Sequence, residues 1–234
     1  MLARADACRR GSFYVNVAAM QKIAIIGSGQ VGDALAKGFL SFGHAVMRGS
    51  REPAKLQKWK DEAQGEASIG TLAEAAAWGE VIVLAVKGTA AEETIDLLGA
   101  ANLAGKLILD ATNPIADAPP DNGVLRYFTN ANESLMERLQ KKAPDAKFVK
   151  AFNSVGNAFM VNPPFDPKPT MFICGNDGEA KHQATAILTA FGWESVDVGG
   201  VEAARPIEAL CQLWCAPGFL RQDWTHAFKY LKLS

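Results

Sequence analysis

The sequence predicts an α/β protein, with a doubly wound and mostly parallel sheet of about eight strands and a small helical segment at its C-terminal end. Two observations carry this prediction. Apolar runs alternate with helical patterns from Gln21 onward, which is typical of β-α-β units with helices on both faces of a sheet. The runs at 81–86 and 106–110 are continuously apolar, as expected for strands covered on both faces.

The first helix shows how clear the periodicity is. Val31, Leu35 and Phe39 recur at helical spacing, and Gly43 ends the pattern. Seven further strands are predicted at 44–48, 66–69, 81–86, 106–110, 147–152, 171–174 and 194–198. Further helices are predicted at 53–64, 71–78, 130–142 and 177–191, the one at 130–142 as a charged surface helix. A proline-rich loop at 162–169 separates the first six strands from the last two.

Three regions are expected along the chain. Residues 1–20 form a flexible N-terminal extension, residues 21–200 the main domain, and residues 201–234 a helical segment interrupted by Pro206 and Pro217. The arginines and short apolar stretch of the extension also fit a weak export signal, but no cleavage site is convincing. An upstream start codon is a further interpretation, because Met20 immediately precedes the first strand.

Composition excludes several classes of function. The chain has 234 residues, 49% of them hydrophobic, and a formal net charge of -1, so nothing in its overall charge attracts nucleic acid or an anionic membrane. No apolar run is long enough to span a bilayer, and we expect a cytoplasmic protein. The four cysteines show no zinc-ligand spacing, so no metal site is expected. Cys211 and Cys215 would share a helix face, as a redox pair or as small buried residues.

A glycine-rich turn joins the first strand to the first helix. It reads Gly27-Ser28-Gly29-Gln30-Val31-Gly32, a G-x-G-x-x-G pattern in the strand-turn-helix context that dinucleotide binding requires. Gly27 would permit the tight turn, Gly29 the approach of a pyrophosphate, and Gly32 close packing of helix on strand. The helix would offer unpaired N–H groups and its positive dipole end to the phosphates. The sequence therefore predicts a dinucleotide site in a Rossmann-like fold.

The end of the second strand indicates which dinucleotide binds. NAD sites usually carry an acidic residue about 20 residues beyond the first glycine. Here Ser50 and Arg51 occupy that region, and Lys55 follows one helical turn later. A 2′-phosphate needs charge-assisted donors, and arginine offers them in a planar fork, so we predict NADP. Glu52 is the competing residue, because a small change in register would make it a ribose ligand.

The opposite end of the cofactor should lie after the fourth, fifth and sixth strands, whose carboxyl ends face the same crevice. The candidates are small or amide-bearing residues in these three loops: Ala85, Val86, Lys87, Asn113, Pro114 and Asn153. Asn113 and Asn153 would bond ribose hydroxyls or a carboxamide. The alternative is that Asn113-Pro114 only initiates a turn.

Four segments together resemble the NADPH:coenzyme F420 oxidoreductase-like family. They are residues 22–32, 49–51, 110–114 and 149–153, and the similarity extends from Gln21 to about Val198. The resemblance implies an NADP-binding Rossmann domain with a small C-terminal portion, usually in a homodimer, that passes hydride between nicotinamide and a deazaflavin. The nucleotide domains of membrane-bound ferric reductases share the resemblance. The motifs are specific for the cofactor and much less so for the acceptor.

The predicted activity is hydride transfer between NADP(H) and a flat small-molecule acceptor such as coenzyme F420 or a flavin. Such a reaction depends on alignment and exclusion of water more than on an acid or base, and no catalytic residue is assigned. His44, His182 and His226 are more typical of structural positions. The alternatives are a ferric or flavin reductase and a non-catalytic NADP sensor. The 34 residues after Gly200 are too few for the helical substrate domain of β-hydroxyacid dehydrogenases and imine reductases.

Overall fold

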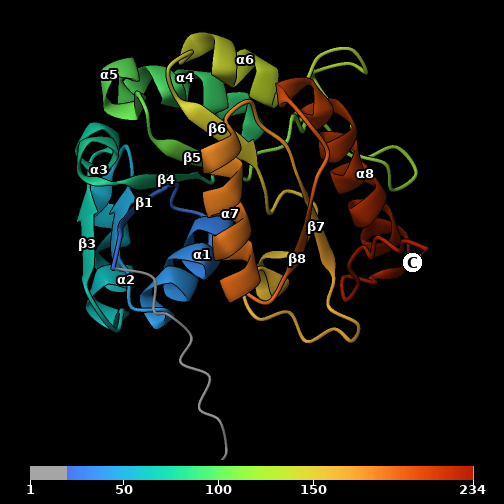
Figure 1. Ribbon diagram of the computed structural model, residues 1–234, viewed down its shortest axis with the longest axis horizontal. Helices are drawn as coiled ribbons and strands as arrows, with labels where there is room; N and C mark the ends of the chain where they lie inside the picture. The colour runs from blue at the N-terminus through green and yellow to red at the C-terminus, as the bar shows by residue number, and fades with distance from the viewer. Residues whose placement is uncertain (1–19, 234) are drawn as a thin grey trace, which may run out of the picture.

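The computed structural model describes residues 20–233, so the N-terminal extension predicted at 1–20 lies outside the described residues except for Met20. All eight predicted strands form. They are β1 (Lys22–Ile26), β2 (Ala45–Gly49), β3 (Ala67–Gly70), β4 (Val81–Leu84), β5 (Leu107–Asp110), β6 (Lys147–Lys150), β7 (Thr170–Ile173) and β8 (Glu194–Asp197). Figure 1 shows their arrangement.

The strands of the described residues divide between two sheets. The larger has the order β3-β2-β1-β4-β5-β6, all parallel, which is the Rossmann order and confirms the predicted fold class. The parallel pair β7-β8 forms a separate sheet, so the expectation of one sheet of about eight strands is corrected to six and two. A single antiparallel bridge, Lys150 to Cys174, joins the second sheet to the edge strand β6 where a continuous ladder would be needed to extend the first.

Helices cover both faces of the larger sheet. The helices of the described residues are, in chain order, α1 (Gln30–Ser41), α2 (Gln57–Glu62), α3 (Leu72–Trp78), α4 (Gly88–Leu98), α5 (Ala100–Leu103), α6 (Leu135–Lys142), α7 (Gly178–Ala190) and α8 (Ala204–Arg221), with 3₁₀ turns η1 (Pro53–Leu56), η2 (Asn157–Phe159) and η3 (Val201–Ala203). The last of them, α8, packs instead against α6, η3 and β7. One apolar core lies under α1, α2 and α7, and a second under α3 to α6. Alternate strand residues feed the two cores: Ile23 and Ile25 one, Ala24 and Ile26 the other.

Two predicted helices differ from the observed ones. The helix expected at 130–142 begins at Leu135, because the Ser134 hydroxyl accepts from the Glu137 N–H and the Glu137 carboxylate accepts from the Ser134 N–H. In the C-terminal segment, residues 204–221 form one helix, α8, without the interruptions at Pro206 and Pro217 that the sequence predicts, and residues 222–233 are not helical. Pro206 lies in the first turn, where an N–H needs no intrahelical acceptor, so it removes no intrahelical hydrogen bond. Pro217 lies four residues before the end of α8 and removes the one bond that an N–H there would donate to the Leu213 carbonyl, without ending the helix.

In residues 20–233 no helix is both long and apolar enough to cross a membrane. The turn between β1 and α1 lies at the switch point of the sheet, beside the carboxyl ends of β2 and β4.

Candidate functional site

The three glycines of the turn have three different surroundings. Gly27 has φ +137°, and a Cβ there would lie 2.2 Å from the Ala85 carbonyl oxygen. A Cβ on Gly32 would lie 2.8 Å from the Gly27 oxygen. A Cβ on Gly29 would meet nothing within 4 Å among the described residues. Gly27 and Gly32 therefore serve the fold of the turn itself, whereas the space above Gly29 is open to a ligand.

A groove of about 310 Å³ runs over this turn. It is lined by Gly27, Ser28, Gly29, Gly49, Ser50, Arg51, Leu72, Ala85, Val86, Lys87, Ala90 and Thr94. Eight of the predicted site residues are among them, brought together from the ends of β1, β2 and β4. Gln30, Val31 and Gly32 form the first turn of α1, and its N-cap residue, Gly29, provides no side-chain cap. The first-turn N–H groups therefore point out of the helix end with no capping side chain from the described residues.

The residues predicted to select NADP lie on the same edge. Ser50 is buried and its hydroxyl accepts from the Glu52 N–H at 3.1 Å, which shapes the loop after β2. Arg51 is 68% exposed and contacts Glu93 only at 3.9 Å, so its guanidinium is available to a ligand. Lys55 bonds the Glu52 carboxylate at 2.6 Å. Glu52 is not part of the groove lining, and Lys55 lies on the wall of a neighbouring cavity rather than in the groove.

The loops after β5 and β6 meet through their two asparagines. Asn113 donates from Nδ2 to the Asn153 carbonyl at 2.8 Å, and Asn153 donates to Asn113 Oδ1 at 3.1 Å and to the Ile207 carbonyl at 2.9 Å. Asn153 is 4% exposed, and Pro114 is buried beside Asn113. Phe152, which precedes Asn153, has φ +62°, an unfavourable value for a bulky residue and one that accumulates at functional sites. The two amides thus hold the loops together, and their cofactor contacts stay a prediction.

Comparison with known proteins adds to this geometry. The sequence profile of the family described as "NADP oxidoreductase coenzyme F420-dependent" matches residues 22–114. The F420-dependent NADP reductase of Methanocaldococcus jannaschii is 30% identical over 203 residues, which cover 82% of this chain and 90% of that protein. The chain belongs to the coenzyme F420-dependent NADP oxidoreductase family. Membership places it among NADP-dependent oxidoreductases.

Two further relatives show how far the likeness extends. A putative F420-dependent NADP-reductase from Arthrobacter sp. FB24 has the same fold, with a TM-score of 0.84, 29% identity, and coverage of 91% of this chain and 100% of that one. Metalloreductase STEAP3 of Rattus norvegicus is 30% identical over 189 residues. This chain spans only 36% of that metalloreductase, although the match takes in 81% of the chain.

A buried ionic cluster lies beneath the asparagine loops of this family member. The Lys150 ammonium contacts Asp110 Oδ2 at 2.7 Å and Glu208 Oε1 at 2.9 Å, and it donates to the Thr112 carbonyl at 2.9 Å. Asp110 accepts in turn from the Thr112 N–H at 2.9 Å and hydroxyl at 2.7 Å. The side chains of Lys150 and Asp110 are fully buried and that of Glu208 is 2% exposed. The cluster therefore fixes the chain between Asp110 and Asn113.

The predicted minor candidates lie away from the groove. His44 accepts from the Gln21 N–H at 3.3 Å, His226 bonds the Trp214 carbonyl at 3.0 Å, and His182 is exposed on α7. Residues 20–233 contain no cluster of ligands able to hold a metal ion. Cys174 is buried, and burial raises the pKa of its thiol to about 12. The Sγ atoms of Cys211 and Cys215 are 4.0 Å apart. The interpretation of this pair as a redox pair stays a prediction.

Sequence reasoning did not single out Arg48, Lys150, Asp110 or Glu208. A usable signal was present, because a charged residue inside a continuous apolar strand must have a buried partner. Arg48 near the end of β2 and Lys150 at the end of β6 are such residues, and both are buried. Their partners come from other elements, and the spacing of the sequence does not reveal which.

Proposed function

We propose that this protein transfers hydride between NADP(H) and a flat acceptor such as a deazaflavin or a flavin. The observation that carries the proposal is the groove over the glycine turn, where the open space at Gly29 meets Arg51 and the uncapped first turn of α1. An anionic dinucleotide matches these features, because a helix N-terminus and a guanidinium both favour phosphate. When bound, NADPH supplies the hydride from its nicotinamide ring.

The chain would contribute binding and alignment. Gly29 and the first-turn N–H groups of α1 would hold the pyrophosphate, while Ala85 and Val86 provide a close-fitting wall at the end of β4. The Asn113 and Asn153 loops would border the nicotinamide end, held in place by the buried Lys150 cluster. Lys87 precedes α4, and its exposed side chain pairs with Asp117 at 3.0 Å, a surface contact weak enough for an anionic ligand to replace it.

Selection of NADP over NAD would rest on Ser50, Arg51 and Lys55. Arg51→Ala should weaken NADPH binding by about 1.5 to 3 kcal/mol, the loss expected for a hydrogen-bonded charge, and should leave NADH binding unchanged. Isothermal titration with both cofactors measures this. Arg126→Ala is the matched control, because Arg126 is an exposed arginine that pairs with Asp121 away from the groove lining. An unchanged NADPH affinity in Arg51→Ala would remove Arg51 from the phosphate site.

The acceptor is tested directly by mixing NADPH and purified protein with coenzyme F420, with FMN and with a ferric chelate in parallel. Oxidation of NADPH by F420 or FMN, followed at 340 nm, supports the proposal. Reduction of the ferric chelate alone would favour the metalloreductase alternative, which the likeness to STEAP3 suggests. Tight NADPH binding without turnover in any of the three would favour a non-catalytic sensor.

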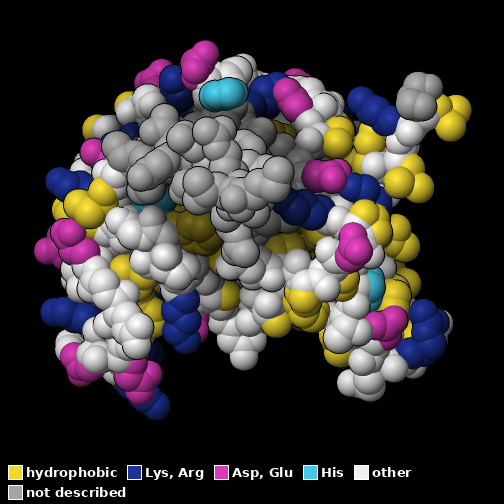
Figure 2. Space-filling model, turned by 60° about the horizontal axis from the view of Figure 1, so that its bottom comes forward, with side chains coloured by type: hydrophobic (Ala, Val, Ile, Leu, Met, Phe, Trp, Pro, Cys, Tyr) yellow, Lys and Arg dark blue, Asp and Glu magenta, His cyan; other side chains and the backbone are white. Residues whose placement is uncertain are grey.

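We also infer that α8 mediates contact between two copies of the chain. Leu213 and Leu220 are 60% and 57% exposed on this helix, and Glu208, its one charged residue between Arg205 and Arg221, is buried. Figure 2 shows hydrophobic side chains gathered on the side of the molecule that carries the C-terminal segment. Sedimentation velocity on wild type and on Leu213→Glu/Leu220→Glu tests the homodimer: the variant should be a monomer. Cytoplasmic location and the absence of nucleic-acid or membrane partners stay predictions.

A further inference from the structure

Arg48 is a buried cation directly beneath the glycine turn. It is 2% exposed, and a strand position between two apolar cores would ordinarily hold an aliphatic residue. Its Nη2 donates to the carbonyl oxygens of Gly27 at 3.2 Å and Gly29 at 3.3 Å, and its Nη1 donates to Asp33 Oδ1 at 3.3 Å. The guanidinium also lies over the Trp59 ring, 5.0 Å from its centroid. One side chain therefore joins β2, the turn, α1 and α2.

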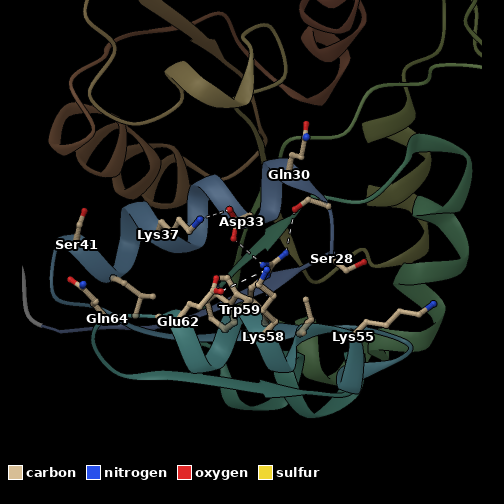
Figure 3. A pocket seen from close by; sticks show the side chains of 15 residues that line it. Ser28, Gln30, Asp33, Lys37, Ser41, Lys55, Lys58, Trp59, Glu62 and Gln64 are labelled. Atoms are coloured by element: carbon tan, nitrogen blue, oxygen red, sulfur yellow. Dashed lines mark hydrogen bonds and ion pairs between the residues drawn. The ribbon is translucent and has the colours of Figure 1, made fainter.

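Arg48 lies on the side of the turn away from the cofactor groove. It lines a separate cavity of about 640 Å³ between α1 and α2, which Figure 3 shows with Asp33, Lys37 and Trp59 among its walls. The groove over the turn is lined by Gly27, Ser28 and Gly29 but not by Arg48. The two cavities share only Ser28 and Gly29, the residues of the turn that separates them.

Holding the carbonyls of the turn orients its amides. In a trans peptide the C=O and the N–H of the next residue point in opposite directions. Arg48 binds the Gly27 oxygen, so the N–H of Ser28 points away from Arg48. The Gly29 oxygen also accepts from the Asp33 N–H at 3.0 Å, so Arg48 and the first bond of α1 together direct the N–H of Gln30 away from Arg48. Both N–H groups therefore point away from the side of the turn on which Arg48 lies.

The charge of Arg48 is only partly compensated. Asp33 shares its carboxylate with Lys37 at 2.7 Å and is 35% exposed. The bonds of Arg48 are longer than the 2.7 to 2.9 Å typical of charge-assisted pairs, and its Nε has no hydrogen-bond partner among the described residues. A buried guanidinium with weak compensation projects its positive potential through the thin turn into the groove.

We propose that Arg48 is a positioning residue for the cofactor: it fixes the peptide planes of the glycine turn and adds positive potential beneath the pyrophosphate. This rests on the proposed binding of NADP(H). Because Arg48 acts on the pyrophosphate subsite, it strengthens binding of NADPH and NADH equally. Arg51, which lies in the loop after β2 and lines the groove, distinguishes NADPH from NADH. Gly32 leaves room for this arrangement, since a Cβ there would lie 2.8 Å from the Gly27 oxygen that Arg48 binds.

The test compares Arg48→Met with Arg51→Ala by titration of NADPH and of NADH. Arg48→Met should lose about tenfold or more in affinity for both cofactors, the loss expected for hydrogen bonds to a charged group, while Arg51→Ala loses NADPH affinity alone. In steady-state kinetics, Arg48→Met should raise the KM for NADPH and leave kcat unchanged, because the lost interaction stabilises the bound cofactor equally in the ground state and the transition state. Arg48→Lys should recover part of the loss, since an ammonium reaches one carbonyl.

Unchanged affinities in Arg48→Met, or a loss confined to NADPH, would overturn the proposal, whereas failure of the wild type to bind NADPH would overturn the proposed function itself. If Arg48→Met does not fold, Asp33→Asn provides the test. It keeps an acceptor for Nη1 and removes the negative charge, so NADPH affinity should rise by about two- to fivefold. Unchanged or weaker binding in a folded Asp33→Asn protein would overturn the electrostatic contribution of Arg48.

Discussion

The N-termini of α1 and α6 present the same chemistry and are used in opposite ways. At α6 the N–H groups of Leu135 and Met136 donate to the Glu208 carboxylate at 2.9 and 3.1 Å, and the Ser134 hydroxyl takes the next N–H. At α1 the N-cap is Gly29, which has no side chain, and the turn opens into a groove. One helix end is neutralised by an anion from the protein itself, and the other is left for an anion from solution.

The contrast shows what distinguishes a binding site from a structural cap. Both helix ends attract negative charge, because unpaired N–H groups and the helix dipole act at each. The α6 end is sealed by Glu208, whose charge is shared with the buried Lys150. At the α1 end the buried cation Arg48 pairs with the Asp33 carboxylate, which Lys37 shares, and with no other carboxylate among residues 20–233. Under the proposal above, the positive potential of the α1 end is therefore available to a ligand, and that of the α6 end is not.

The largest expected effect comes from removing Lys150, the buried cation that pairs with Glu208 at the α6 N-terminus. Lys150→Met would leave Asp110 and Glu208 as buried carboxylates without a cation, which should cost about 3 to 5 kcal/mol of unfolding free energy in urea. Lys147→Met, on the same strand, is the matched control, since the Lys147 side chain is 38% exposed and its loss should matter little. Equal losses of unfolding free energy in the two variants would show that the buried cluster contributes no more to stability than the exposed Lys147 side chain.

A second prediction concerns the open end. Gly29→Ala should leave the free energy of unfolding within about 0.5 kcal/mol of wild type, because Gly29 has φ -80° and a Cβ there has room. The same substitution should weaken NADPH binding by about tenfold or more, because the added methyl group would crowd the phosphate. Gly27→Ala should instead destabilise the fold by about 1 to 3 kcal/mol, since its φ is +137°. Urea unfolding and NADPH titration separate the two. Full NADPH affinity in Gly29→Ala would mean that the cofactor does not approach this atom.

The smallest effect concerns the ion pair beside the sealed end. Arg205 bonds the Glu137 carboxylate through Nε at 3.0 Å and Nη2 at 2.5 Å and, with the Ser134 bonds, holds the pKa of Glu137 at about 2. A carboxyl with a depressed pKa stabilises the fold above its ordinary pKa of 4.5 and loses that contribution as pH falls toward 2.

Arg205→Met should therefore lower the urea midpoint at pH 7 and approach wild type as pH falls to about 2. The exposed pair Arg126–Asp121 supplies the control, because Arg126→Met should change the midpoint less. A difference between Arg205→Met and wild type that is independent of pH would show that the contribution of Arg205 comes from packing.

The predictable features of this molecule depend on residues that are close in sequence, and the unpredictable ones depend on residues that are far apart. Strands, the glycine turn and the Ser50-Arg51 loop follow from local patterns, because period, turn chemistry and switch-point position are all encoded within a few residues. The division of eight strands into two sheets depends on a single bridge at Lys150, and the continuity of α8 depends on where its prolines fall within the helix. The buried ionic cluster joins residues up to 98 positions apart, from Asp110 to Glu208, which no local pattern reveals.

Glu208 has a consequence for the order in which the chain can mature. During synthesis the N-terminus of α6 emerges before residue 208 exists, so the N–H groups of Leu135 and Met136 wait without the Glu208 carboxylate, whereas Lys150 already has Asp110 as a partner. The six-stranded sheet can form early, yet the α6 N-terminus keeps these two N–H groups unpaired with Glu208 until α8 docks. Docking of α8, the last helix among residues 20–233, thus completes the cap of α6, and a nascent chain halted before Glu208 should be held as an incompletely folded intermediate.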